Sequence, residues 1–141
     1  MTLMTKIHQW SVAEAGLDLG KLCCAIGNFD GVHKGHQALI AVARKTAQQS
    51  GLPLAVVCFS PHPRRYFQPS NPPFLLMDSY TKAKMLAAEQ VDFMIEIHFD
   101  ERLQTMSPED FVRIVLYDAL DVSRLFAGAD FAFGKGRVGT V

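Results

Sequence analysis

A glycine- and histidine-rich run in the first third of the chain has the residue types of a phosphate-binding loop. It reads Gly27-Asn28-Phe29-Asp30-Gly31-Val32-His33-Lys34-Gly35-His36. Glycine allows a ligand to approach the backbone closely, and a helix that starts here would turn its free N–H groups and its dipole toward an anion. His33 and His36 are three residues apart, so they share one helical face and can donate hydrogen bonds to phosphate oxygens. The loop therefore predicts a polyphosphate site.

The same histidines allow a second interpretation, a metal site. Structural and catalytic zinc takes three or four protein ligands, so His33 and His36 would need a further ligand such as His62. The spacing of His62 gives no specific support, and we assign no residue to a metal. The sequence allows two roles for Asp30. It can cap its own turn by accepting from local N–H groups, which we favour, or act directly on the substrate.

The elements that must position this loop alternate between strand-like and helix-like patterns. Short apolar runs predict four buried strands and a candidate edge strand: 22–27, 54–59, 93–97, 122–127 and 6–10. Helices are predicted at 36–49, at 79–89 and from the Ser107 N-cap to about residue 120. This order predicts an α/β domain of the Rossmann-like, nucleotidylyltransferase type, a parallel sheet with helices on both faces.

Apolar spacing on the helices predicts which residues face the sheet. The expected buried residues are Leu39, Val42, Ala43 and Ala47, then Ala83, Leu86 and Ala87, then Phe111, Val115 and Leu116. In such sheets, ligands bind at the carboxyl ends of the strands, near the point where the strand order reverses. The segments after the strands at 22–27, 54–59 and 122–127 all leave from that edge, so we expect them to converge on one pocket.

Residues 60–77 interrupt the alternation. Five prolines fall in this stretch, with Pro53 shortly before it: Pro61, Pro63, Pro69, Pro72 and Pro73. Because proline lacks an N–H and clashes with the preceding turn, a continuous helix is not expected. We expect a functional loop with one helical turn at 65–68.

The composition sets outer limits on function. The chain has 141 residues, 49% hydrophobic and 20% charged, with a formal net charge of zero, which fits one soluble domain. It has no basic stripe for nucleic acid, no apolar run of the ~20 residues that span a membrane, and no recognisable signal peptide. Cys23, Cys24 and Cys58 fall in predicted strands, so we expect reduced, buried thiols and a cytoplasmic protein.

Three segments resemble the motifs of one family, the adenylyltransferase half of bacterial bifunctional riboflavin kinase/FAD synthetases. Residues 27–36 resemble its GxFDGxHxGH signature, of which the HxGH core alone indicates only the nucleotidylyltransferase superfamily. Phe59-Ser60-Pro61-His62-Pro63-Arg64 is similar to its F-[ED]-P-H-P segment, with Ser60 in place of the acid. Gly128-Ala129-Asp130-Phe131-Ala132-Phe133-Gly134-Lys135 is similar to its G-x-[DN]-F-x-F-G-[KR] segment. The three occur in the family's order and cover nearly the whole chain.

The resemblance implies transfer of AMP from ATP to FMN, giving FAD and pyrophosphate, with Mg²⁺ accompanying ATP. The FMN phosphate would attack directly, so catalysis would consist of positioning and charge stabilisation. His33 and His36 would bind the ATP phosphates and stabilise the leaving pyrophosphate. The other positions implied to bind ATP or FMN are Gly27, Asn28, Phe29, Asp30, Gly31, Gly35, Phe59, His62, Pro63, Arg64, Asp130, Phe131 and Phe133.

Some of these roles stay open. Arg64 or Arg65 can pair with the FMN phosphate, or both can be solvated surface residues. Phe131 and Phe133 would point to opposite sides of an extended chain, one toward the flavin and the other into the core. Asp130 would orient flavin or loop groups.

The family pattern continues beyond residue 141 with an ISSTxIR motif that contributes to the nucleotide site, and then with a riboflavin kinase module. We therefore expect residues 1–141 to be an FMN adenylyltransferase domain truncated at its C-terminus, with the kinase module absent. One alternative is a folded nucleotide- or flavin-binding fragment without activity. The other is a different HxGH adenylyl- or cytidylyltransferase, against which the segments at 59–64 and 128–137 argue.

Overall fold

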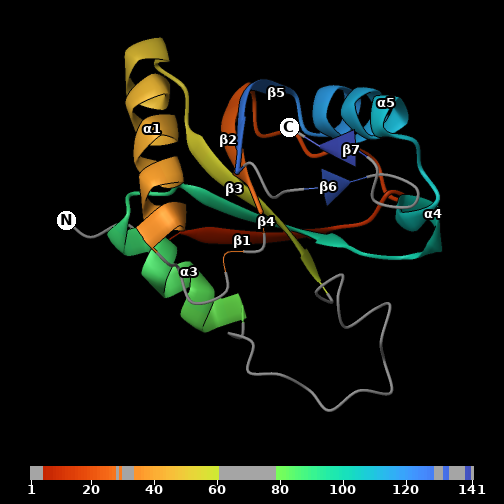
Figure 1. Ribbon diagram of the computed structural model, residues 1–141, viewed down its shortest axis with the longest axis horizontal. Helices are drawn as coiled ribbons and strands as arrows, with labels where there is room; N and C mark the ends of the chain where they lie inside the picture. The colour runs from red at the N-terminus through yellow and green to blue at the C-terminus, as the bar shows by residue number, and fades with distance from the viewer. Residues whose placement is uncertain are drawn as a thin grey trace.

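A five-stranded parallel sheet forms the centre of the computed structural model, which describes residues 5–27, 29, 34–60, 79–128, 132–133 and 139–140 (Figure 1). Its strands are β1 (Lys6–Trp10), β2 (Leu22–Ile26), β3 (Leu54–Ser60), β4 (Phe93–His98) and β5 (Val122–Ala127). They lie in the order β1-β4-β3-β2-β5, and all pairings within this sheet are parallel. All five predicted strands are present, and β1 is an edge strand, as predicted. The prediction that 122–127 is a buried core strand was wrong: β5 is the opposite edge strand, with a neighbour on one side only among the described strands, and none of its residues is buried.

Helices cover both faces of the sheet. The helical elements are α1 (Lys34–Ser50), α3 (Ser79–Ala88), α4 (Glu101–Gln104), α5 (Pro108–Asp110) and the π-helix η1 (Phe111–Ala119). Helices α1 and α3 lie on one face, and α5 with η1 on the other (Figure 1). The arrangement confirms the predicted α/β, Rossmann-like fold.

Three short elements were not predicted from the sequence. Helix α4 is a single turn, capped by Asp100, whose Oδ1 accepts from the N–H of Leu103 at 3.0 Å. Strands β6 (Ala132–Phe133) and β7 (Gly139–Thr140) form an antiparallel pair. Elements of two to four residues are too short to show a hydrophobic period.

The strand order reverses at β2. From β2 the chain passes through α1 to β3 on one side, whereas β5 joins the sheet on the other side of β2 after η1. The carboxyl end of β2 is therefore the switch point of the sheet, and Gly27 directly follows it. This is the place where open α/β sheets bind ligands.

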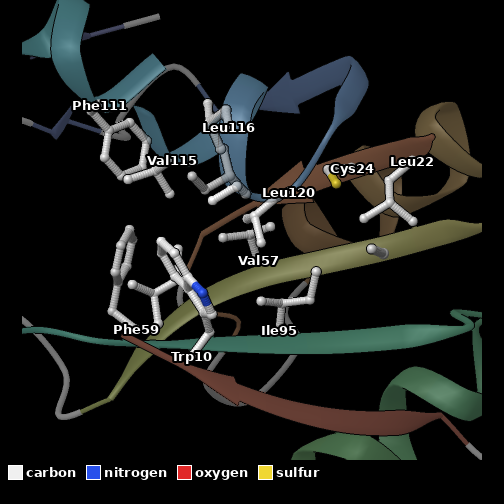
Figure 2. Packing of buried hydrophobic residues seen from close by; sticks show 14 of the residues in the cluster. Trp10, Leu22, Cys24, Val57, Phe59, Ile95, Phe111, Val115, Leu116 and Leu120 are labelled. Carbon is white, nitrogen blue, oxygen red and sulfur yellow. The ribbon is translucent and has the colours of Figure 1, made fainter. Parts of the chain in front are cut away.

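Alternate side chains of the strands point to opposite faces of the sheet and belong to two separate hydrophobic cores. On β3, Ala55, Val57 and Phe59 belong to the core under η1, which Figure 2 shows with Phe111, Val115 and Leu116. Leu54, Val56 and Cys58 belong to the core under α1 and α3. Burial on both faces explains why this strand reads as a continuous apolar run instead of an alternating one.

The three cysteine thiols are buried, as predicted. Cys23, Cys24 and Cys58 are each 0% exposed, and burial raises the pKa of the Cys24 thiol above its ordinary value. Within the part of the chain that the structure describes, no helix has both the length and the apolar character needed to cross a membrane.

The predicted buried face of α1 was wrong at one position. Val42 is 54% exposed, whereas Ile40, which was not predicted to be buried, is 0% exposed. Ile40, Ala43 and Ala47 recur every three or four residues and form the buried stripe. Val42 is two residues from Ile40, or about 200° around the helix, which turns it away from the sheet.

The helix that starts at Ser107 has the predicted cap but a wider winding. Ser107 Oγ accepts from the N–H of Asp110 at 3.1 Å, and Pro108 is the first helical residue. Beyond Phe111 the chain forms a π-helix, and the N–H of Leu120 donates to the carbonyl of Val115, five residues back, at 3.1 Å. Phe111, Val115 and Leu116 are buried as predicted. Hydrophobic spacing does not distinguish the two windings, because both place residues three to five apart on one face.

Gly16 lies where the segment after β1 crosses the end of η1. The N–H of Leu17 donates to the Ala119 carbonyl at 3.0 Å, and a Cβ on Gly16 would lie 2.8 Å from the same oxygen. Gly16→Ala is therefore expected to destabilise the fold by about 1–3 kcal/mol, as overpacking does elsewhere. Urea unfolding measures this, with Gly128→Ala as control because nothing lies within 4 Å of its Cβ position. Equal midpoints for the two variants would contradict the prediction.

Candidate functional site

The connection from β2 to α1 forms the centre of the candidate site. The N–H of Gly27 donates to the Val57 carbonyl at 3.0 Å, which extends the β2–β3 pairing by one residue beyond β2. Helix α1 begins at Lys34, and its first turn carries no acidic residue. Its positive dipole end and first N–H groups are therefore not compensated by an acid of the helix itself, and the position favours an anionic ligand.

Phe29 packs beneath the first turn of α1. Its side chain is 1% exposed and belongs to the core under α1 and α3. Its ring centroid lies 4.9 Å from that of His36, with the ring planes tilted by 56°. Phe29 also adopts a φ of 56°, which is uncommon for a residue with a side chain. Because the phenyl ring is held in the core, it restricts where the His36 ring can lie.

Gly27 is required by this packing. A Cβ at Gly27 would meet Cε2 of Phe29 at 3.1 Å, a closer approach than ordinary van der Waals contact. Gly27, Phe29 and His36 are thus brought together at the carboxyl end of β2, as the sequence predicts. Phe29 was predicted to bind a substrate, and the structure places its ring in the core; direct contact with a ligand stays a prediction.

The structure describes only part of the predicted site. For Gly35 and Phe133 it describes the backbone alone, in α1 and β6. The predicted site residues outside the described part are Asn28, Asp30, Gly31, His33, His62, Pro63, Arg64, Asp130 and Phe131. The predicted helical turn at 65–68 and the alternative role of Arg65 also lie outside it.

Phe59 lies at the carboxyl end of β3 within a group of aromatic rings. Its centroid is 5.9 Å from the Phe99 ring in an edge-to-face arrangement and 6.3 Å from the Phe111 ring. The side chain is 7% exposed and points into the core under η1 (Figure 2). Phe59 was predicted to bind a substrate, which stays a prediction. The packing of Phe99 and Phe111 around it was not predicted, because these contacts join separate elements.

A cleft of about 280 Å³ opens at the carboxyl ends of β1, β3 and β4. Its described lining residues are Gln9, Trp10, Ser11, Glu14, Ser60, Glu96 and His98. They include the carboxylates of Glu14 and Glu96 and the imidazole of His98. This cleft was not predicted from the sequence. Its one sequence signal is Glu96, a charged residue inside the apolar run at 93–97.

No protein-bound metal centre is formed by the described residues. Among them, no group of three or more His, Cys, Asp or Glu side chains could hold a metal ion.

Comparisons with known proteins agree with the resemblance noted in the sequence. A family model described as FAD synthetase matches residues 17–141. The chain is 44% identical over 114 residues to the bifunctional riboflavin kinase/FMN adenylyltransferase of Pseudomonas fluorescens, covering 81% of this chain and 36% of that protein. It is 36% identical over 140 residues to the Escherichia coli K12 protein of the same description, covering 99% and 43%. The chain thus spans about two fifths of these relatives' length.

A solved structure has a similar fold. It is described as a macrolide-efflux protein from Streptococcus pneumoniae, and the two superpose with a TM-score of 0.80 at 27% identity. The match covers 93% of this chain and 51% of that one. The efflux description concerns that protein, and the superposition supports the fold described above.

Proposed function

We propose that this chain, which belongs to the FAD synthetase family, transfers AMP from ATP to FMN and so forms FAD and pyrophosphate. The observation that carries the proposal is His36 in the first turn of α1, backed by the Phe29 ring at 4.9 Å, at the switch point of the sheet. Such a position suits a donor that must meet the phosphates of a nucleotide.

In this reaction, an oxygen of the FMN phosphate attacks the α-phosphorus of ATP. A new phosphoanhydride bond forms, and the bond from the α-phosphorus to the bridging oxygen breaks, releasing pyrophosphate. Negative charge grows on the leaving pyrophosphate, where N–H donors from His36, His33 and the start of α1 would stabilise it. Mg²⁺ would neutralise further phosphate charge when it enters with ATP. No protein nucleophile is needed.

The order of the strands divides the proposed site into two halves. ATP would bind at the loop after β2, with Asn28, Asp30, Gly31 and Gly35 around its phosphates. FMN would bind on the side of β3, because the segment with His62, Pro63 and Arg64 follows directly after Ser60 in the chain. Asp130 and one of the two aromatic residues Phe131 and Phe133 are proposed to contact the flavin.

The test is formation of FAD. The chain is incubated with FMN, ATP and Mg²⁺, and FAD and pyrophosphate are measured, with the Pseudomonas fluorescens relative as positive control. We expect FAD with ATP, and no corresponding product when CTP replaces ATP. FMN and CTP joined into a dinucleotide would instead support the cytidylyltransferase alternative. An active positive control beside a chain that neither forms FAD nor binds FMN would contradict the proposal.

A second candidate function follows from the coverage of the relatives. Because the chain spans 36% and 43% of the two relatives' lengths, it can act as a nucleotide- and flavin-binding part whose activity needs the remainder. Joining the corresponding C-terminal part of the Pseudomonas fluorescens protein to residue 141 tests this. FAD from the joined chain alone would favour this candidate. FAD from the 141-residue chain would rule it out.

The proposed cellular setting follows the same reasoning. The relatives' descriptions include riboflavin kinase. A riboflavin kinase module covalently joined to this domain would supply FMN to its site. We propose that the reaction takes place in the cytoplasm, where buried thiols such as those of Cys23, Cys24 and Cys58 stay reduced.

A further inference from the structure

Glu96 occupies an unusual position for a carboxylate. It lies on β4, between Gln9 of β1 and Cys58 of β3 in the strand register, and it is 5% exposed. Its strand neighbours Ile95 and Ile97 are both 0% exposed. A charged group at such a position is costly unless it receives hydrogen bonds. Its partners should therefore show what the residue does.

Both carboxylate oxygens of Glu96 accept hydrogen bonds from other elements. Oε2 accepts from Ser79 Oγ at 2.7 Å, and Oε1 accepts from Gln9 Nε2 at 3.4 Å. Ser79 is the first residue of α3, and the first turn of α3 has no acidic residue of its own. Glu96 thus brings negative charge from the sheet to the positive end of this helix and links α3, β1 and β4.

Ser60 and Ser79 are the two ends of the chain around the segment that carries His62, Pro63 and Arg64. Ser60 ends β3, lines the same cleft as Glu96, and accepts through its carbonyl from the N–H of Phe99 at 3.0 Å. Ser79 begins α3 and donates directly to Glu96. Glu96 therefore lines the same cleft as Ser60, where the chain leaves the sheet, and accepts a hydrogen bond from Ser79, where the next helix begins.

We propose that Glu96 is a positioning residue for the FMN half of the site, which it serves by holding the start of α3 against the carboxyl ends of β1 and β4. The inference rests on the proposed function. We expect the effect to fall on FMN because α3 follows the segment that carries His62, Pro63 and Arg64, whereas the ATP loop follows β2, two strands away from β4 in the sheet. Glu96 is not proposed to contact either substrate and acts through Ser79.

The test compares substrates under steady-state conditions. Glu96→Gln keeps the shape and removes the charge, Ser79→Ala removes the donor, and Ser79→Thr keeps the hydroxyl. A hydrogen bond to a charged group is strong enough for KM for FMN to rise on the order of ten-fold in Glu96→Gln and Ser79→Ala. KM for ATP and kcat should stay within about two-fold of the wild type, and Ser79→Thr should resemble the wild type.

Glu89→Gln is the matched control. It makes the same chemical change just beyond the other end of α3, where Glu89 meets Arg44 at 3.5 Å, and it should leave KM for FMN unchanged. Titration of FMN fluorescence gives the same comparison as a Kd, so the inference is tested even if the chain binds FMN without forming FAD. Ser79→Ala and Ser79→Thr keep the test valid if Glu96→Gln fails to fold.

The outcomes separate the two proposals. If the wild-type chain forms FAD, and Glu96→Gln and Ser79→Ala have the same KM for FMN as Glu89→Gln, the proposed function stands and the role of Glu96 is overturned. Equal losses for FMN and ATP would also overturn it, because they indicate general damage to the fold. A wild-type chain that neither binds FMN nor forms FAD would overturn both proposals.

Discussion

His36→Ala is expected to reduce the rate of FAD formation by about 10²-fold or more, the loss seen when one donor to a developing oxyanion is removed. His36 lies in the first turn of α1, and the Phe29 ring 4.9 Å away limits its orientation. A donor that is already oriented needs little reorganisation when charge appears on the leaving pyrophosphate. Its loss should therefore lower kcat much more than it raises KM for FMN. Pyrophosphate release measures both parameters.

His8→Ala is the control for this variant. It removes the same side chain from β1, which is separated from β2 by β4 and β3 in the sheet. We expect it to keep turnover within about two-fold of the wild type. Thermal melting of both variants shows whether the fold survives the substitution. A folded His36→Ala protein with near-normal turnover would refute the role assigned to His36.

Phe111→Ala is expected to destabilise the protein by about 3–5 kcal/mol, the usual cost of truncating a buried phenylalanine. Phe111 is 2% exposed, begins η1, and lies 6.3 Å from Phe59 in the core under that helix (Figure 2). Truncation would leave a cavity between η1 and the carboxyl end of β3. Because a rigid sheet borders this cavity, little of it can close by relaxation. Urea unfolding monitored by circular dichroism measures the loss.

Val112→Ala is the matched control for stability. The next residue along η1 is 46% exposed, so its truncation should change the free energy of unfolding by no more than about 0.5 kcal/mol. Phe111→Leu, which fills most of the volume, should fall between the two. A Phe111→Ala midpoint equal to that of Val112→Ala would show that the packing in Figure 2 contributes little to stability.

Local patterns in the sequence were sufficient for most of the secondary structure. Short apolar runs predicted β2 to β5, and the Ser107-Pro108 cap predicted where the last helix starts, because strands and caps depend on neighbouring residues. The same patterns misplaced Val42 and did not anticipate the burial of Lys82 on α3, which is 5% exposed. The face that a helix buries depends on where the sheet lies, and single-helix spacing does not contain that information.

The prediction of a phosphate-binding loop at 27–36 comes from the sequence itself, because glycine, histidine and a helix start are all local features, and it stays a prediction. Only the tertiary structure decided that Phe29 is buried beneath His36. It also decided that Glu96 meets Gln9, which is 87 residues away in the chain, and Ser79. These contacts join separate strands and helices, so they exist only after the parallel sheet has assembled in the order β1-β4-β3-β2-β5. The residue types of the candidate site can be read from the local sequence, whereas the relative positions of their side chains depend on how distant elements pack.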